Sequence, residues 1–150
     1  MPKRSLPTFY LEDFTPYQLA VVATAISEDL AKVYRQHFNI SIAEWRILAF
    51  LIDGGAHPIS VRDLEAQVML DRPKVSRATT RLEDAGYVEK RINATDRRLI
   101  QISLTEKGRA TMAELLPHAI AYQKRLEEFM GEGFAGLQAG LTCLRKLDRG

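Results

Sequence analysis

The chain is poor in the residues that build disulfides and metal centres. It contains one cysteine, Cys143, and three histidines, at positions 37, 57 and 118. A single cysteine excludes an intramolecular disulfide and a zinc site made of several thiolates. The histidines lack metal-ligand spacing and no carboxylates cluster beside them, so neither a metal nor another cofactor is expected. Cys143 itself is predicted to be a small buried residue of the last helix.

Long apolar runs are also missing. The longest uninterrupted run extends from Ile47 to Ile52, whereas a membrane-spanning helix needs about 20 apolar residues. Lys3 and Arg4 near the start are not followed by the apolar stretch of a secretory signal. We therefore expect a cytoplasmic protein without a membrane partner.

The sequence signatures of common enzymes are absent as well. The chain has no phosphate-cradling glycine loop, no nucleophile elbow, and neither an HExxH nor a CxxC motif. Its acidic residues and serines do not have the spacing of catalytic pairs. The sequence therefore favours a protein that is not an enzyme.

Charge is nearly balanced over the whole chain but not along it. The formal net charge is +2, and residues 60–109 carry 11 Lys and Arg against 8 Asp and Glu. The flanking segments, 1–59 with 5 against 6 and 110–150 with 5 against 5, have no positive excess. A local basic excess is typical of proteins that bind phosphate, although a solvated surface can have the same composition.

Residues that cap helices are well placed along the chain. The expected N-caps are Thr15, Ser41, Ser60, Asp71 and Thr105. Two of them begin capping boxes, Thr15 with Gln18 and Ser41 with Glu44, in which each side chain bonds a backbone N–H of the other. The first helix is predicted to end near Asn39, and Gly86 is predicted to end the fourth.

Two segments between these caps have distinctive patterns. The second helix is apolar on almost every side from Trp45 to Ile52, so it should lie between two packed layers and end at Gly54 and Gly55. Residues 87–92 and 98–104 are rich in β-branched residues, and a polar turn at 93–97 separates them. This pattern predicts a β-hairpin.

The order helix, short helix, helix, hairpin over residues 41–104 predicts a winged helix-turn-helix. The helix that follows Asp71 would be its recognition helix, with Val75, Thr79 and Leu82 facing the core. Its other face combines long cations with short hydroxyls, as expected for a helix that enters a DNA groove. That face consists of Lys74, Arg77 and Arg81 together with Ser76 and Thr80.

The hairpin tip supplies a second indication of DNA binding. Arg97 and Arg98 could enter a minor groove, and Asp96 could hold one guanidinium in place through a bidentate pair. The alternative is a turn followed by solvated arginines. The residues expected to contact DNA are Ser60, Arg62, Arg72, Pro73, Lys74, Ser76, Arg77, Thr80, Arg81, Asp96, Arg97 and Arg98.

Several of these segments closely resemble the multiple-antibiotic-resistance regulator (MarR) family of bacterial transcription factors. The resemblance lies in residues 71–77, 82–91, 96–98 and 102–108, and Trp45 also fits. It implies an obligate homodimer that binds pseudo-palindromic operators and responds to small phenolic or aromatic acids. It also implies that Ser76 and Arg77 lie in the recognition helix and that Asp96 and Arg98 lie in the wing.

The expected fold is mainly α with a small β-wing. Residues 41–108 would form the winged helix-turn-helix, and residues 1–40 with 109–150 would form a helical dimerisation region. The long apolar stripes of these terminal helices favour a homodimer, because a single chain would leave them exposed. They could instead pack only within their own chain.

Aromatic and polar residues gather where the first two helices should meet, which is the usual composition of a small-ligand site. The expected ligand-binding residues are Tyr17, Tyr34, His37, Phe38, Trp45 and Arg46. Ordinary core packing is the alternative for each of them. Together with what the resemblance implies, these patterns predict a homodimeric repressor that binds double-stranded DNA and is released by a small aromatic effector. Two alternatives stay open, a constitutive winged-helix regulator and a protein-interaction adaptor without an effector.

Overall fold

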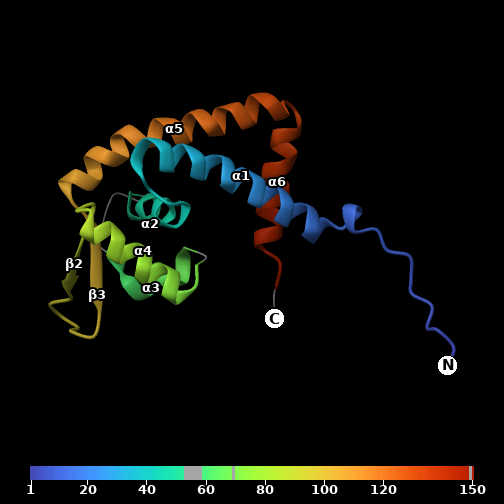
Figure 1. Cartoon of the computed structure of the whole chain (residues 1–150), viewed down its shortest axis with the longest axis horizontal. Coiled ribbons are helices and arrows are strands. Elements are labelled where there is room, and N and C mark those ends of the chain that lie inside the picture. Colours follow the sequence, from blue (N-terminus) through green and yellow to red (C-terminus); the bar gives the residue numbers. More distant parts are fainter. Residues whose placement is uncertain (53–58, 69, 149) are drawn as a thin grey trace.

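A small antiparallel sheet stands at one end of a mainly helical molecule (Figure 1). The computed structural model describes residues 1–52, 59–68, 70–148 and 150. The helices are η1 (Leu11–Asp13, a 3-10 turn), α1 (Thr15–Phe38), α2 (Ile42–Ile52), α3 (Val61–Gln67), α4 (Arg72–Asp84), α5 (Glu106–Met130) and α6 (Gly133–Arg145). The strands are β1 (Ile59–Ser60), β2 (Val88–Ile92) and β3 (Ile100–Leu104). The predicted fold class, mainly α with a small β-wing, is confirmed.

Strands β2 and β3 form the predicted hairpin, and β3 lies at the centre of the sheet, between β1 and β2. Ile92 lies opposite Ile100 beside the turn, and Val88 lies opposite Leu104 at the base. Strand β3 begins two residues later than predicted because Leu99 belongs to the turn, where its backbone N–H donates to the Asp96 carbonyl oxygen (3.0 Å). The two-residue strand β1 was not predicted.

Helix α2 occupies the middle of the molecule, as its apolar pattern predicted. It packs against α1 on one side and against α4 and β3 on the other (Figure 1). Ile47, Leu48 and Leu51 are buried in the core. The predicted helix end at Gly54 and Gly55 lies outside the described residues.

Four of the five predicted caps are confirmed. In each case the side-chain oxygen accepts a backbone N–H three residues further on, at distances of 2.9 to 3.1 Å. The capping residues are Ser41 of α2, Ser60 of α3, Asp71 of α4 and Thr105 of α5. These bonds fix where the helices of the winged unit begin.

The predicted cap at Thr15 is wrong. Helix α1 includes Thr15, Phe14 occupies the N-cap position, and no side chain accepts a capping hydrogen bond there. The turn η1 places the Glu12 carbonyl oxygen near the helix start, and the Gln18 side-chain amide donates to it (2.8 Å). Gln18 therefore fastens α1 to the preceding turn instead of completing a capping box.

A tight joint connects the wing to α5. The Thr105 hydroxyl donates to the Gly86 carbonyl oxygen (2.5 Å), and the Thr105 backbone N–H donates to the Tyr87 carbonyl oxygen (3.1 Å). Gly86 has φ +81°, the left-handed conformation predicted for it. A Cβ at Gly108 would overlap the Tyr87 carbonyl oxygen, so only glycine fits at that position. Both ends of the hairpin are thereby held against the start of α5.

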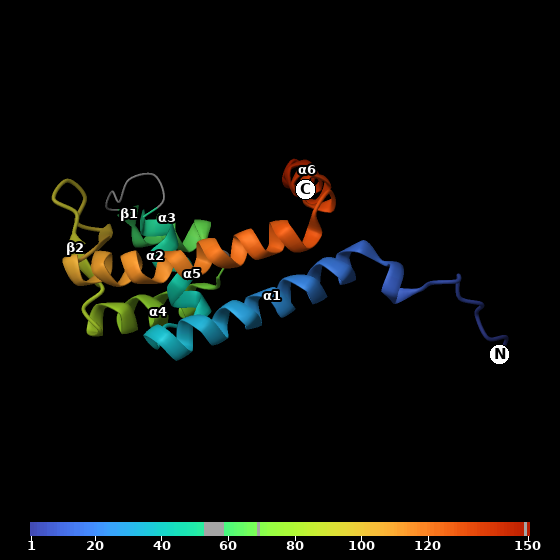
Figure 2. The same ribbon diagram turned by 90° about the horizontal axis from the view of Figure 1, so that it is seen from above.

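The terminal helices lie largely outside the core. Helix α6 turns away from the end of α5, and residues 1–10 extend away from the helices (Figures 1 and 2). No residue of α6 is buried, and Val22, Leu137 and Leu144 are 55%, 41% and 41% exposed. Cys143 is also exposed, so the prediction that it is buried is wrong for the single chain. Among the described helices, none is long and apolar enough to cross a membrane.

Candidate nucleic-acid interface

The two faces of α4 separate as predicted. Val75, Thr79 and Leu82 have no exposed surface, and Ala78 beside them is 6% exposed. The buried Thr79 hydroxyl donates to the Ser76 carbonyl oxygen (3.1 Å), so its polar group is satisfied within the helix. The opposite face is exposed and carries Lys74, Ser76, Arg77, Thr80 and Arg81.

The cations on and beside α4 differ in how they are paired. Arg72 Nε lies 3.5 Å from a Glu65 carboxylate oxygen, and Lys74 Nζ lies 3.6 Å from that of Asp71. Arg77, by contrast, takes part in no ion pair within the described part of the chain. Its guanidinium is therefore available to an external anion.

At the wing tip, Asp96 holds the Arg98 guanidinium. Arg98 Nε and Nη2 donate to the two carboxylate oxygens of Asp96 at 3.1 and 3.3 Å, and the Arg98 backbone N–H adds a third bond (3.1 Å). These bonds, helped by the positive charge of Arg62, lower the pKa of the Asp96 carboxyl. The predicted bidentate pair is confirmed, and Arg98 is the arginine it orients. Arg97 beside it is exposed.

A hollow of about 430 Å³ lies between α3, the start of α4 and the wing. Arg62, Arg72 and Arg98 line it, together with the Glu65 carboxylate that pairs with Arg72. The Ser60 hydroxyl, by contrast, accepts the backbone N–H of Asp63 as the cap of α3. Three arginines against one carboxylate leave this hollow with a net positive charge, which suits an anion.

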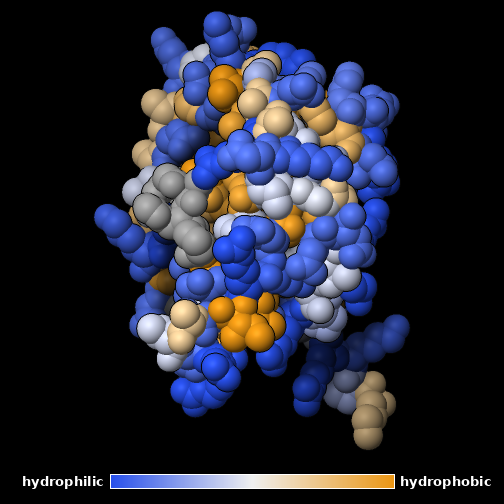
Figure 3. Space-filling model, turned by 90° about the vertical axis from the view of Figure 1, so that its left-hand side faces the viewer, coloured by the Kyte–Doolittle hydropathy of each residue, from blue (hydrophilic) through white to orange (hydrophobic). Residues whose placement is uncertain are grey.

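The wing end of the molecule has a largely hydrophilic surface with several apolar areas between the polar side chains (Figure 3). Ile92 and Ile100, which face each other across the hairpin, are 68% and 46% exposed. The wing thus presents apolar as well as cationic side chains to solvent.

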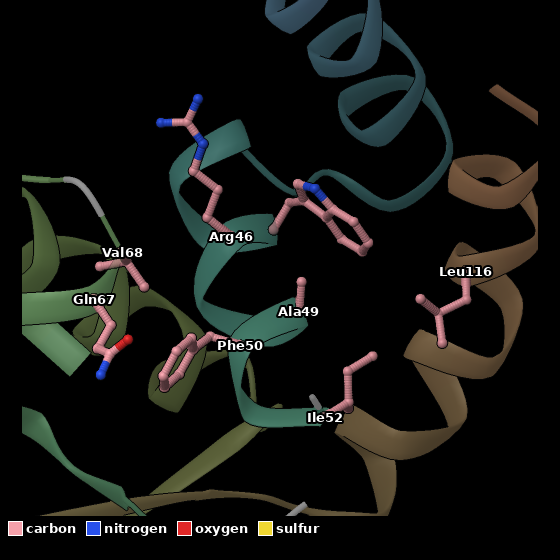
Figure 4. Close-up of a pocket in the computed structure, with 8 residues that line it drawn as sticks. Arg46, Ala49, Phe50, Ile52, Gln67, Val68 and Leu116 are labelled. Atoms are coloured by element: carbon pink, nitrogen blue, oxygen red, sulfur yellow. The ribbon is translucent and has the colours of Figure 1, made fainter. Parts of the chain in front are cut away.

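A second, larger hollow of about 1030 Å³ borders α2. Its lining residues are Trp45, Arg46, Ala49, Phe50, Ile52, Gln67, Val68 and Leu116. Ile52 and Ala49 lie on the side of α2 that faces Leu116 of α5, whereas Phe50 lies towards Gln67 and Val68 (Figure 4). The lining is mainly apolar, and its polar side-chain groups are the Arg46 guanidinium, the Gln67 amide and the Trp45 indole N–H.

Three of the other predicted ligand-binding residues, Tyr34, His37 and Phe38, form two groups near α2. Tyr34 packs on Trp45 with ring centroids 4.7 Å apart. His37 stacks on His118 with centroids 5.0 Å apart, and Phe38 makes an edge contact with the His118 ring. Tyr34 is fully buried and its hydroxyl has no hydrogen-bond partner among the described residues. Burial raises the pKa of the Tyr34 hydroxyl to about 12.

Comparison with known proteins agrees with this geometry. Residues 38–99, which contain α2, the helix-turn-helix and the first half of the wing, match the model of the MarR family. Over these residues the chain is similar to the MarR family.

Proteins similar to this chain include the HTH-type transcriptional regulator FarR of Neisseria gonorrhoeae, which is 30% identical over 93 residues. That match spans 62% of this chain and 62% of the length of FarR. The crystal structure of a MarR/EmrR family regulator from Acinetobacter sp. ADP1 is similar with a TM-score of 0.80 and 29% identity, covering 91% of this chain and 96% of that one. The structure of NadR in complex with 4-hydroxyphenylacetate is similar with a TM-score of 0.74 and 26% identity. The match covers 99% of this chain and 100% of the NadR chain.

Not every predicted ligand-binding residue lies near the hollow beside α2. Tyr17 precedes Tyr34 by 17 residues on the same helix, which is about 25 Å along its axis, and it is 42% exposed. The sequence also missed lining residues, both on α2 itself and on the segments around α3 and α5 that approach α2 only in the folded chain. Those missed residues are Ala49, Phe50, Ile52, Gln67, Val68 and Leu116.

Proposed function

We propose that this chain is a transcriptional repressor of the MarR family, and that it binds a pseudo-palindromic operator in double-stranded DNA as a homodimer. The observation that carries the proposal is the exposed basic face formed by α4 and the oriented Arg98 of the wing. Long cations and short hydroxyls on one helix can pair phosphate contacts with contacts to base edges. Arg77, which is free of ion pairs within the described chain, is the candidate base reader.

The hollow between α3, α4 and the wing fits the DNA backbone. A recognition helix in the major groove and a wing in the adjacent minor groove leave one sugar-phosphate strand between them. On this protein that strand would cross the hollow lined by Arg62, Arg72 and Arg98. Their charge supplies phosphate contacts that set the register without reading sequence.

A second copy of the chain would cover the exposed terminal helices. Val22 of α1 and Leu137 and Leu144 of α6 are at least 41% exposed, and the described contacts of α6 are made mainly with α5. Exposed apolar surface of this kind is typical of interfaces. Two-fold symmetry would also place two copies of α4 about 34 Å apart, as successive major grooves require.

The effector would occupy the hollow beside α2. An aromatic ring can pack on Trp45, and a carboxylate can pair with Arg46, which both line it. The structure of NadR with 4-hydroxyphenylacetate shows that a protein of this fold, 26% identical to this chain, takes an aromatic acid. Because α2 contacts both α1 and α4, a ligand beside it can bias the angle between the helical lobe and the recognition helix.

The DNA-binding part is tested by selecting a duplex from a random pool with the full-length protein. Arg77→Ala should then weaken binding of that duplex by about 1–3 kcal/mol, roughly 5- to 150-fold. Arg35→Ala, which removes an exposed arginine of α1, is the matched control and should change it little. A change below twofold for Arg77→Ala in a folded dimer would contradict its role, and failure to select any duplex would favour the protein-interaction adaptor.

The effector part is tested with 4-hydroxyphenylacetate and a panel of aromatic acids and phenols. Trp45 is the only tryptophan, so its fluorescence reports directly on the hollow. We expect an active compound to quench it over the concentration range in which it releases DNA. Release without quenching, with unchanged potency in Trp45→Phe, would place the pocket elsewhere, and no effect of any compound would indicate a constitutive regulator.

A further inference from the structure

Glu44 is the only buried carboxylate among the described residues. It lies in the first turn of α2, is 4% exposed, and points one carboxylate oxygen at Nε of Arg81 in the last turn of α4 (3.5 Å). The Arg81 side chain is 67% exposed. The pair therefore joins a buried anion on the central helix to a surface cation on the recognition helix.

The sequence pattern predicted other roles for these two residues, a helix cap for Glu44 and a DNA contact for Arg81. Glu44 has capping-box spacing to Ser41, and half of that box forms, because the Ser41 hydroxyl accepts the Glu44 backbone N–H (3.1 Å). The Glu44 side chain, however, is engaged with α4. Arg81 was expected to contact DNA because it follows Lys74 and Arg77 on one helical face.

A buried carboxylate without a cationic partner is strongly disfavoured, so Glu44 needs Arg81 in the folded chain. Arg81 follows Arg72 by nine residues, which places it about 13.5 Å further along α4. Recognition helices contact base edges with their N-terminal residues. Both the partner and the position of Arg81 therefore argue against base reading.

We propose that Arg81 is a positioning residue, and that its pair with Glu44 sets the orientation of α4 against α2. The inference rests on the proposed DNA-binding function and adds to it the residue pair that aligns the reading helix. Glu44 is also followed directly by Trp45 and Arg46, which line the hollow beside α2. A ligand that displaces this turn of α2 would displace the partner of Arg81 as well.

The test uses the full-length protein, the duplex selected by the wild type, and an unrelated duplex of the same length. The variants are E44Q, R81Q, the double variant E44Q/R81Q, and R81K, which keeps the charge. We expect E44Q and R81Q each to weaken selected-duplex binding by roughly 2- to 30-fold. The double variant should lose no more than either single variant, because both remove the same interaction.

Three further readouts separate positioning from direct contact. The slope of log affinity against log salt should stay at the wild-type value in R81Q, since no phosphate contact is lost, and binding of the unrelated duplex should not change. R81Q should lower the melting temperature, the double variant should recover it, and R81K should retain wild-type affinity. If R81Q does not fold, E44Q and R81K carry the test through affinity and salt slope.

A direct contact between Arg81 and DNA would give a different set of results. If Arg81 contacts phosphate, R81Q will reduce the salt slope by about one and weaken both duplexes alike, whereas E44Q will tighten binding by freeing the guanidinium. Unchanged melting temperature and affinity in R81Q would likewise overturn the inference. A wild-type protein that selects no duplex would overturn the proposed function instead, and the melting temperatures would still report whether the pair joins the two helices.

Discussion

Replacing Tyr34 by phenylalanine should stabilise the protein, although it removes a polar group from the core. The Tyr34 side chain is fully buried, and its hydroxyl has no partner among the described residues. A buried donor without a partner costs about 1–3 kcal/mol, and phenylalanine keeps the ring that packs on Trp45 at 4.7 Å. We expect Tyr34→Phe to raise the free energy of unfolding by about 1 kcal/mol at neutral pH, which corresponds to about 2–4 °C in melting temperature.

The same substitution should have a larger effect in alkali. Burial raises the pKa of the Tyr34 hydroxyl from 10.0 to about 12. The folded state therefore holds this proton more tightly than the unfolded state. The contribution of this proton to the stability of the wild type is complete below pH 10 and is lost as the pH rises towards 12. The advantage of Tyr34→Phe over the wild type should grow by about 1.4 kcal/mol at pH 11, since one pKa unit is equivalent to 1.36 kcal/mol.

Denaturant unfolding at pH 8 and pH 11, at one protein concentration, measures both effects. Tyr17→Phe is the matched control, because Tyr17 is 42% exposed on the same helix and its hydroxyl can bond water. It should leave stability unchanged at pH 8. A Tyr34→Phe protein that is less stable than the wild type, with no growing advantage in alkali, would show that the hydroxyl has a partner and would refute the reasoning.

Three other changes test the wing, the joint and the terminal helices. Gly108→Ala should destabilise the protein by about 1–3 kcal/mol in thermal unfolding, because the new Cβ overlaps a backbone carbonyl oxygen, whereas Gly136→Ala, with open space around it, should not. Asp96→Ala should free Arg98 and remove one negative charge, so binding of unrelated DNA should strengthen while discrimination for the selected duplex falls; equal discrimination would contradict the orienting role. Deleting residues 134–150 should give monomers in light scattering and abolish operator binding, and a persistent dimer would refute this placement of the interface.

The parts of the fold that depend on short-range sequence were predictable. Ser41, Ser60, Asp71 and Thr105 cap helices through bonds to residues three positions away, and such bonds depend little on the rest of the molecule. The pairing of Asp96 with Arg98 is equally local. The wing and the two faces of α4 follow from the hydrophobic period alone.

The parts that depend on tertiary packing were not predictable. Glu44 and Arg81 meet only because α2 packs on α4, and His37 meets His118 only because α1 packs on α5. The failure of the capping box at Thr15 has a similar origin, since η1 supplies a competing carbonyl oxygen to Gln18. The sequence therefore identified residues suited to a site but not the partners that hold them.

The joint at Thr105 places the wing at the end of a long arm, helix α5. Because both ends of the hairpin are bonded to the first turn of α5, the wing must travel with that helix. Helix α5 has 25 residues, about 38 Å of length, so a tilt of about 5° about its far end moves the wing by roughly 3 Å. In a two-fold assembly the opposite wing would move by the same amount, and a few degrees at the dimer seam would be enough to take Arg98 out of register with a minor groove.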